Sequence, residues 1–509
     1  MSSTGGVVPV GTSSAAVNLA AALEPAQLEL ARGPLHVELP GAVRDRIARC
    51  REFVLEVSGS GRAIYGVTTG FGPLVEFEGR ADSVGQSDNT IIHHIVGHGE
   101  LLPPAVARAA VLARLFSLAQ GRSGVSEQVV DSLCAMLDTE FAPAVPKLGS
   151  VGASGDLQPL AYVAHALRGH GNALFQGKLM PAGEALTRAG LKKLELDGRD
   201  ALALVNGVSV TAAALGLAVA QAIRARRSAE LLSALMTDVL GCGTEFTSVG
   251  LLAAFGHPDV ADSGAAIRTW LEGSTPSGER PLQEVYSIRC TPQLIGAAGT
   301  SVRHAEEVVR RDLNGVSDNP LFFPEIKEVV HGGNFFGQPS AFAADQLNVA
   351  LVQLGNLAER QLDLLVDPRR TSGLPPMLSP APGRQHALQG VQISATATVA
   401  AMRRAAVPAS VQSLPTNLHN QDVVPFGTQA AFVALDQANL LRYLHAALAV
   451  ALRQAVHVGA RRPQAPRLAA VLDRIAEEVP PIVEDRPLDV ALGRVADLLD
   501  RVVSEVEGV

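Results

Sequence analysis

The segment GSVGASGDLQPLA, residues 149–161, places Ala153, Ser154 and Gly155 in a row before a helix that is expected to begin at Asp156. Three kinds of chemistry are open for it. The first is a flexible turn, which is what most glycine- and serine-rich stretches form. The second is a nucleophilic serine on a strained turn, and the third is a backbone that reacts with itself. The serine-hydrolase pattern G-x-S-x-G fails, because Asp156 stands where its last glycine belongs.

The segment IIHHIVGHG contains three histidines, His93, His94 and His98. His94 and His98 have the i, i+4 spacing of two metal ligands on one helix. The zinc-protease pattern, however, requires Glu directly after the first histidine, where this chain has Ile95. We therefore interpret these histidines as pocket or core residues and predict no metal site. The chain also lacks the glycine patterns of nucleotide-binding loops in a suitable context.

Two of the four tyrosines stand in informative surroundings. Tyr65 lies in a glycine-rich stretch, and Tyr286 lies three residues before Arg289 in LQEVYSIRC. A buried core tyrosine is the ordinary interpretation of each. Arg289 favours a binding site instead, because its planar guanidinium suits a substrate carboxylate.

Helical periodicity predicts the elements that must position these side chains. Apolar residues recur at three and four positions over about 40–58, and residues 103–136 and 156–167 are also expected to be helical. Runs rich in Ala, Leu and Val predict long helices buried on several sides, at 208–240, 338–366, 388–405 and 427–457. The Gly- and Thr-rich stretch that follows residue 58 predicts a long functional loop. The expected fold is mainly α, with little room for a sheet.

Composition limits the class of protein and its partners. The chain has 509 residues, with 42 basic and 50 acidic side chains and a net charge of −8, which makes nucleic acid an unexpected partner. Its four cysteines have no CxxC spacing, which favours a reducing cytoplasm. The apolar stretch 211–223 is too short for a membrane span. Apolar residues make up 47% of the chain, and on long helices this predicts an oligomer of packed bundles.

Eight motifs occur in order: YGVTTGFG, GSVGASGDLQPLA, ALVNG, YSIRC, SDNP, HGGNF, LAERQ and NQDVVPFG. From about residue 28 to its end, the chain resembles the aromatic amino acid ammonia-lyase and aminomutase family, which includes the histidine, phenylalanine and tyrosine ammonia-lyases. The resemblance implies the long-helix bundle of the fumarase/aspartase-like superfamily and a homotetramer whose active sites are each assembled from three subunits. The expected division is a loose tail over 1–25, a smaller N-terminal domain over 26–205 and the bundle over 206–509.

The resemblance also implies a cofactor made from the chain. In that family the Gly nitrogen of Ala-Ser-Gly attacks the Ala carbonyl carbon, and loss of two waters gives 4-methylideneimidazol-5-one (MIO). Ala153, Ser154 and Gly155 would form it here, with Asp156 helping to set the geometry. Small side chains suit a backbone that must fold tightly on itself. The electrophile is needed because the β-proton is barely acidic and an amine leaves poorly.

The remaining roles come to this chain from the matched motifs. Tyr65 matches the tyrosine assigned as the base that removes the β-proton, which requires surroundings that favour a phenolate, such as helix N-termini. Arg289 would bind the substrate carboxylate with help from Asn319, and Tyr286 is a candidate for proton transfer. The other residues that the resemblance places at the MIO, the substrate amine or the pocket wall are Asn206, Gln283, Asn334, Phe336 and Gln421.

Two places bear on the substrate ring. Histidine-specific members usually have Glu where this chain has Gln421 and Gln where it has Thr291, so both residues indicate a phenyl or phenol ring. The second place is the end of the pocket that holds the substrate ring. There, tyrosine-specific members tend to have His-Leu, phenylalanine-specific members Phe-Leu and histidine-specific members Ser-His. His93 matches the tyrosine pattern and His94 the histidine pattern. Because an imidazole at His93 can bond a para-hydroxyl, we predict L-tyrosine as the substrate.

Several outcomes stay open. A lyase would release p-coumarate and ammonia, whereas an aminomutase would return the amine to the β-carbon and give β-tyrosine, according to how long the inner loop stays closed. A histidine or phenylalanine ammonia-lyase is a further alternative. A non-catalytic helical homologue is a remote one, because it would have no physical reason to keep the Ala-Ser-Gly set with Tyr65, Tyr286 and Arg289.

Overall fold

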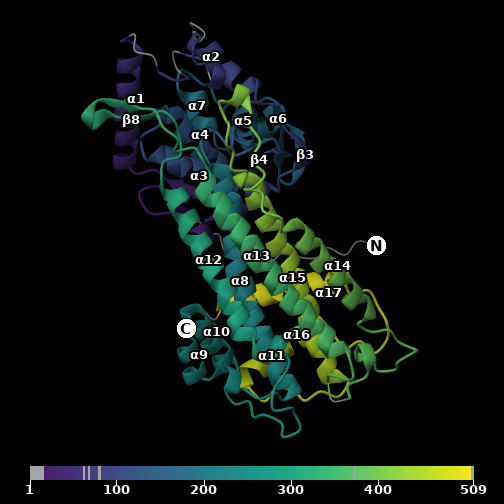
Figure 1. Cartoon of the computed structure of the whole chain (residues 1–509). Helices are drawn as coiled ribbons and strands as arrows, with labels where there is room; N and C mark the ends of the chain where they lie inside the picture. The colour runs from purple at the N-terminus through teal and green to yellow at the C-terminus, as the bar shows by residue number, and fades with distance from the viewer. Residues whose placement is uncertain are drawn as a thin grey trace, which may run out of the picture. The chain divides into compact units, whose positions relative to one another are not determined.

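The computed structural model describes residues 16–60, 64–66, 69–70, 72–77, 82–371 and 373–505. Long α-helices dominate these residues and the strands are three or four residues long, as the expected mainly-α fold requires (Figure 1). None of the helices in the described ranges is both long enough and apolar enough to cross a membrane.

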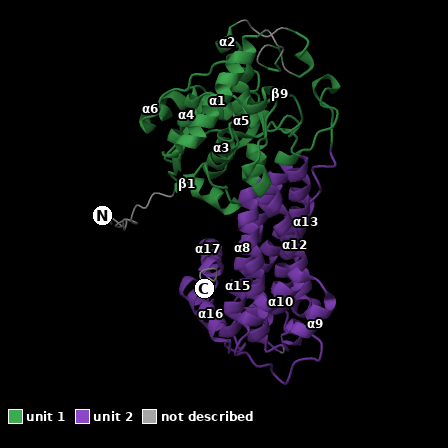
Figure 2. Cartoon of the chain, turned by 90° about the vertical axis from the view of Figure 1, so that its left-hand side faces the viewer, with its two compact units in different colours: residues 1–214, 310–337, 413–428 green, residues 215–309, 338–412, 429–509 purple. Residues whose placement is uncertain are grey.

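The chain divides into two compact units, drawn in green and purple in Figure 2. Unit 1 holds residues 1–214, 310–337 and 413–428, and unit 2 holds 215–309, 338–412 and 429–509. The predicted domain boundary after residue 205 therefore differs from the observed division into units. The chain returns twice to unit 1, so two segments distant in sequence belong to the same unit as the Ala-Ser-Gly motif.

The N-terminal segment also differs from the loose tail expected over 1–25. Residues 1–15 lie outside the described residues. From Ala16 onward the chain is ordered: β1 (Ala16–Asn18) pairs in parallel with β2 (His36–Glu38), and Leu23 is fully buried before the 3₁₀ helix η1 (Pro25–Arg32).

Unit 1 is built around α3 (Pro104–Ala119), whose residues from Val106 onward are all buried. Two arginines on this helix are buried as well, and each is satisfied by backbone carbonyls, as buried charges must be. Arg108 donates to five carbonyl oxygens, those of Ala31, Gly33, Leu137, Thr139 and Phe141. This guanidinium therefore ties η1 and the end of α4 (Glu127–Leu137) to the core helix.

The other helices of unit 1 are α1 (Gly41–Ser58), α2 (Ser83–Ile92), α5 (Leu157–Leu167), α6 (Ala182–Ala189) and α7 (Asp200–Val205). Small antiparallel pairings join β3 (His98–Leu101) to β5 (Pro146–Leu148), β8 (Leu321–Phe323) to β9 (Glu328–Val330), and β4 (Phe141–Pro143) to β6 (Asn172–Phe175), which in turn pairs with β7 (Lys178–Pro181). Short 3₁₀ turns η2 (Gly72–Leu74), η4 (Pro324–Ile326) and η6 (Asn417–His419) complete the unit.

Unit 2 is a bundle whose long helices run alongside one another (Figures 1 and 2). They are α8 (Ser209–Leu240), α12 (Thr291–Asn314), α13 (Gln338–Val366) and α15 (Gly427–His457), of which α8, α12 and α15 have one end in unit 1. Shorter helices surround them: α9 (Val249–Phe255), α10 (Pro258–Trp270), α11 (Tyr286–Arg289), α14 (Gln389–Ala405), α16 (Pro466–Glu478) and α17 (Asp489–Glu505). Small and aliphatic side chains fill the bundle, and Ala446 to Leu452 of α15 are all buried.

Candidate active site

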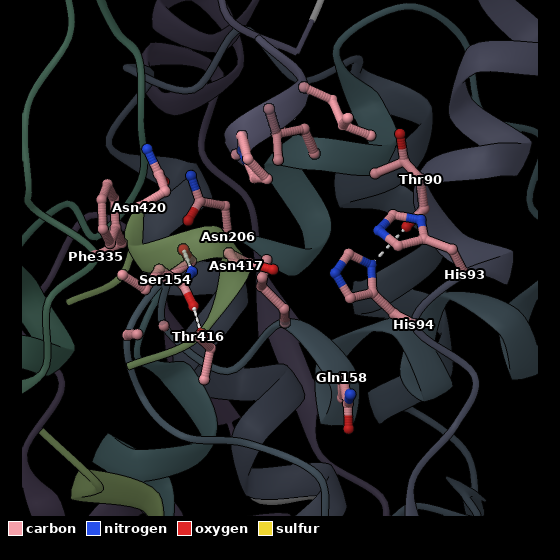
Figure 3. Close-up of a pocket in the computed structure, with 18 of the residues that line it drawn as sticks. Thr90, His93, His94, Ser154, Gln158, Asn206, Phe335, Thr416, Asn417 and Asn420 are labelled. Carbon is pink, nitrogen blue, oxygen red and sulfur yellow. Dashed lines mark hydrogen bonds between the residues drawn. The ribbon is translucent and has the colours of Figure 1, made fainter. Parts of the chain in front are cut away.

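Unit 1 contains a pocket of about 1250 Å³ (Figure 3). It is lined by the loop after α1, the C-terminal end of α2, the segment before α5, and the chain around residues 319, 335 and 416–423. The sequence-predicted site residues that line it are Tyr65, His93, His94, Ala153, Ser154, Gly155, Asn206, Asn319, Phe336 and Gln421. The fold therefore brings most of the predicted site together.

The backbone at Ala153–Gly155 folds back on itself. Isolated bridges join Gly155 to both Gly152 and Ala153, and Gly152 and Gly155 have φ of +72° and +70°. A Cβ atom on Gly155 would lie 2.3 Å from the carbonyl oxygen of Gly207 and 2.6 Å from its nitrogen. No side chain fits there, so glycine is required by both conformation and space. The segment is therefore a tightly closed turn.

Asp156, the next residue, is fully buried. Its Oδ1 accepts hydrogen bonds from the hydroxyls of Thr428 at 2.7 Å and Thr211 at 2.9 Å, and its Oδ2 accepts from the Thr211 N–H at 2.8 Å. Burial raises the pKa of this carboxyl, and the hydrogen bonds oppose the rise without cancelling it. Asp156 does not cap α5 with its side chain. It anchors the closed turn to the first turn of α8 and to Thr428.

Gln421 reaches the tripeptide from a distant part of the chain. Its Nε2 donates to Ser154 Oγ at 2.6 Å, and its Oε1 accepts from Thr416 Oγ1 at 2.5 Å. The Gln421 amide therefore lies between two hydroxyls, with its oxygen toward Thr416 and its N–H group toward Ser154. The backbones of Thr416 and Gln421 also pair, across the turn η6, in which Asn417 and Leu418 have φ of +51° and +53°.

Asn206 follows α7 and is buried, with its side chain near Ser154 in Figure 3. Its Nδ2 donates to the carbonyl oxygen of Asn319 at 3.0 Å. Its Oδ1 is buried and has no hydrogen-bond partner among the described residues. A buried acceptor without a donor is costly, so this oxygen is available to an N–H group of a ligand.

Buried charges hold the loops that carry Asn206 and Asn319. Arg199 Nη2 donates to Asp318 Oδ1 at 2.6 Å and to the Asn319 carbonyl at 3.1 Å. Arg114 Nε donates to the Ala203 carbonyl at 2.9 Å, and its Nη1 donates to that of Ser317 at 2.8 Å. Burial lowers the pKa of Arg114 to about 10, so the side chain remains a cation at neutral pH. Hydrogen bonds from these two buried arginines therefore hold the loops that carry Asn206 and Asn319.

Tyr65 lies at the start of the Gly-rich loop and is half-buried. Its phenol oxygen accepts a hydrogen bond from the Gly72 N–H at 2.8 Å, and its own N–H donates to His331 Nε2 at 3.4 Å. These bonds place the ring on the pocket wall. Residues 61–63, 67, 68, 71 and 78–81 of the predicted loop lie outside the described residues.

His93 and His94 follow the last turn of α2 and face the pocket side by side (Figure 3). His93 Nδ1 bonds the Asn89 carbonyl, and His94 Nδ1 bonds the Thr90 carbonyl at 2.8 Å. Burial lowers the pKa of His94 to about 4, with a smaller contribution from His93. The helix ends at Ile92 and His98 lies in β3, so His94 and His98 do not share a helix, contrary to their spacing.

Four predicted site residues do not line this pocket. Asn334 is exposed, while its neighbours Phe335 and Phe336 both contribute to the wall. Gln283, Tyr286 and Arg289 belong to unit 2. There Arg289 donates to the Glu284 carbonyl at 2.8 Å and stacks on the Tyr286 ring, with its guanidinium carbon 4.9 Å from the ring centroid. Tyr286 is 71% exposed.

Thr416 and Thr90 are among the polar residues of the site that were not predicted from the sequence. Thr416 precedes the NQD motif in PTNLHNQD, and the short polar run was the only available signal. Thr90 stands four residues before His94, which is the spacing at which a side chain can bond a carbonyl at the end of a helix.

Comparison with known proteins places the chain in a family. It matches the family described as aromatic amino acid lyase over residues 24–477. It is 38% identical to a histidine ammonia-lyase of Anaeromyxobacter sp. (strain K), over 92% of this chain and 95% of that protein. It is also 38% identical to a tyrosine ammonia-lyase of Cereibacter sphaeroides, over 90% and 92%.

A solved structure gives the same result for the fold. The tyrosine aminomutase from Streptomyces globisporus superposes with a TM-score of 0.89 at 32% identity, over 96% of this chain and 97% of that one. Sequence and fold therefore agree. The chain belongs to the aromatic amino acid lyase family.

Proposed function

We propose that the protein eliminates ammonia from an aromatic L-amino acid, with L-tyrosine as the preferred substrate and p-coumarate as the product. One observation carries the proposal. The closed turn at Ala153–Gly155 lines a pocket in unit 1 that also contains Tyr65 and the imidazoles of His93 and His94. A tyrosine-sized molecule needs only part of the volume of about 1250 Å³.

The turn supports the formation of MIO from Ala153, Ser154 and Gly155. Gly155 pairs with Ala153. Because Gly155 has no Cβ atom, the Gly207 backbone can lie in close contact with the turn. When formed, MIO supplies an electrophilic methylene that takes up the substrate amine and makes it a better leaving group. Asp156 and Gln421 hold the segment from either side.

The other pocket residues have roles that follow from their hydrogen bonds. Asn206 Oδ1, buried without a donor among the described residues, would accept from the substrate amine. Tyr65, fixed by the Gly72 N–H, would take the β-proton as general base. His93 would bond the para-hydroxyl of the ring, and Asn319 would support the substrate near Asn206.

We further propose a homotetramer in which neighbouring subunits supply Gln283, Tyr286 and Arg289. In this chain the three residues lie in unit 2, and Tyr286 is largely exposed. Arg289 would bind the substrate carboxylate through its fork of N–H donors, and Tyr286 would move a proton. Gln283 would lie against the substrate amine.

Two other outcomes have specific support. The structural neighbour from Streptomyces globisporus is named a tyrosine aminomutase, which favours β-tyrosine as an alternative product. Relatives named histidine ammonia-lyase, such as that of Anaeromyxobacter, favour histidine as an alternative substrate. Gln421 and the imidazole of His93 support a hydroxylated phenyl ring, whereas His94 matches the pattern of the histidine-specific members.

The test is incubation of the purified protein with L-tyrosine, L-phenylalanine and L-histidine separately, followed by chiral separation of the products. Coumarate alone is expected and would identify a lyase. β-Tyrosine would identify an aminomutase, and urocanate would overturn the substrate assignment. Replacing Ser154 by Ala removes the source of the methylene, so the variant is expected to form no product. Preserved turnover in Ser154→Ala would refute the mechanism.

A further inference from the structure

A short segment far along the chain, residues 426–428, contacts both sides of the Ala-Ser-Gly tripeptide. On the side before the tripeptide, the Phe426 N–H donates to the carbonyl oxygen of Val151 at 3.0 Å. On the side after it, the Thr428 hydroxyl donates to Asp156 Oδ1 at 2.7 Å. The segment 426–428 therefore connects the two ends of the stretch that contains the tripeptide, and all of these residues belong to unit 1.

Thr428 is also part of a chain of buried hydrogen bonds. Ser150, Thr428 and Asp156 are each less than a tenth exposed. Thr428 Oγ1 lies 2.8 Å from Ser150 Oγ, and Ser150 Oγ lies 3.1 Å from the Gly152 nitrogen. The chain of bonds therefore runs from the backbone before the tripeptide to the carboxyl group that follows it.

The chemistry of its two ends gives this chain one direction. The Gly152 N–H can only donate, and an ionised carboxylate can only accept. Thr428 therefore directs its proton toward Asp156, and its oxygen accepts from the Ser150 hydroxyl. Other acceptors lie farther from Ser150 Oγ, namely Asp156 Oδ1 at 3.3 Å and the Gly155 carbonyl at 3.5 Å. Hydrogen bonds aligned in this way strengthen one another in a buried site.

Formation of MIO requires two atoms of the tripeptide backbone to approach each other. The nitrogen of Gly155 forms a bond to the carbonyl carbon of Ala153. The carbonyl oxygen then leaves as water with the protons of the Gly155 and Ser154 nitrogens, and the electron pair of the Ser154 N–H bond completes a C=N bond. Because an amide nitrogen is a weak nucleophile, the rate of closure depends on how well the fold holds the two atoms together.

We infer that Ser150 and Thr428 are positioning residues for this ring closure. Their hydroxyls hold the backbone at Gly152 and Asp156, on either side of the tripeptide, in the closed turn. Neither side chain takes part in a bond that forms or breaks. The inference rests on the proposed function, because it concerns the formation of MIO in the same site.

The experiment measures intact mass at intervals after cell-free synthesis of the full chain, and so gives the rate at which two waters are lost. Thr428→Val replaces the hydroxyl by a methyl group of similar size, and Asp156 keeps its two hydrogen bonds from Thr211. A hydrogen bond to a charged group corresponds to a factor of roughly 10 to 100, so the rate is expected to fall by about 10-fold or more. Thr428→Ser keeps the hydroxyl and is expected to restore the wild-type rate.

Ser150→Ala interrupts the same chain at its other end. It leaves the Gly152 N–H without its acceptor and is expected to slow the loss of water by roughly 10-fold. Because both replacements break one chain, the double variant is expected to be little slower than the slower single variant. Reductions that multiply in the double variant would show two separate effects and would contradict the chain.

Thr237→Val is the matched control, because it makes the same replacement at another buried threonine. The Thr237 hydroxyl donates to the Ser233 carbonyl at 2.8 Å within α8, in unit 2. This variant is expected to lose water at the wild-type rate. The urea midpoint of each variant shows whether it is folded under the conditions of the assay.

A folded Thr428→Val or Ser150→Ala variant that loses water at the wild-type rate would overturn the inference. If Thr428→Val does not fold, the rate of Ser150→Ala decides. These outcomes differ from a failure of the proposed function, in which the wild-type protein itself would lose no water.

Discussion

At the scale of single residues, the direction of hydrogen bonds decides what the pocket can do. Thr416 donates to Gln421 Oε1, and Nε2 of the same amide donates to Ser154 Oγ. In the proposed maturation Ser154 loses this oxygen as water: the Cα–H electron pair becomes the Cα=Cβ bond, and the Cβ–O pair leaves with the oxygen. An N–H directed at the departing oxygen stabilises the negative charge that develops on it.

Thr416→Val is therefore expected to slow the loss of water, because the Gln421 amide can then turn its oxygen toward Ser154. The expected reduction in rate is roughly 3- to 10-fold, the equivalent of one ordinary hydrogen bond. Intact mass measured at intervals after cell-free synthesis of the full chain gives the rate.

Thr416→Ser keeps the hydroxyl and should mature at the wild-type rate. Thr187→Val is the matched control: Thr187 is exposed in α6, where its hydroxyl bonds the Gly183 carbonyl. Equal rates for wild type and Thr416→Val would show that the orientation of the amide does not matter.

The sequence predicted the site only in part at this scale. Tyr65, Ser154, Asn206 and Gln421 lie in motifs that the resemblance could match. Thr416 acts through a contact with residues far away in the chain, and nothing in a single sequence reports such a contact. Thr90 contributes a carbonyl oxygen, which any residue would have supplied.

At the scale of elements, the closed turn before α5 is the feature on which the site depends. Gly155 and Gly177 have nearly the same positive φ, +70° and +72°. They differ in their surroundings: a Cβ on Gly155 would meet the Gly207 backbone at 2.3 Å, whereas one on Gly177 has nothing within 4 Å.

Gly177→Ala is expected to lower the free energy of unfolding by about 1–2 kcal/mol, which is the conformational strain alone. Gly155→Ala is expected to cost about 2–5 kcal/mol, because the clash adds to the same strain. Urea denaturation of the two variants checks this. Equal losses would mean that the Gly207 backbone moves away without cost.

Elements that are apolar on several sides could be predicted from the sequence, and others could not. The run at 208–240 corresponds to α8 (Ser209–Leu240), and the run at 427–457 corresponds to α15 (Gly427–His457). The shorter α12 (Thr291–Asn314) was not predicted, because charged and polar residues interrupt its apolar pattern. Strands of three or four residues, such as β8, are too short for alternation to be seen.

At the scale of the whole molecule, the division into units does not follow the order of the chain. The motif SDNP lies in the segment 310–337 that returns to unit 1, whereas YSIRC lies in unit 2. A motif identifies a residue and its family role, but it does not say which part of the fold holds the residue. Asn319 accordingly lines the pocket, whereas Arg289 lies outside its wall.

Stability of the bundle should depend on acid through His445 of α15. This side chain is buried, its Nε2 has no partner in the described ranges, and burial lowers its pKa to about 3. The unfolded chain takes up a proton below its ordinary pKa of about 6.5, whereas the folded chain does not. The contribution of neutral His445 to the free energy of unfolding is therefore fully present above a pH of about 6.5. It falls as the pH decreases toward 3, by about 2 kcal/mol at pH 5.

His445→Leu is expected to remove this part of the pH dependence, seen as a smaller decrease in the urea midpoint between pH 7 and pH 5. His457→Leu, at an exposed position of the same helix, should behave as the wild type. A decrease in His445→Leu as large as in the wild type would assign the acid sensitivity to other groups.

The most direct test of the account is the intact mass of the purified full-length chain. Conversion of Ala153, Ser154 and Gly155 into MIO removes two waters, so we predict a mass two waters below that of the sequence. Ser154→Ala has no hydroxyl to lose and should be at most one water lighter than its own sequence. A wild-type mass equal to that of the unmodified sequence would contradict the central claim.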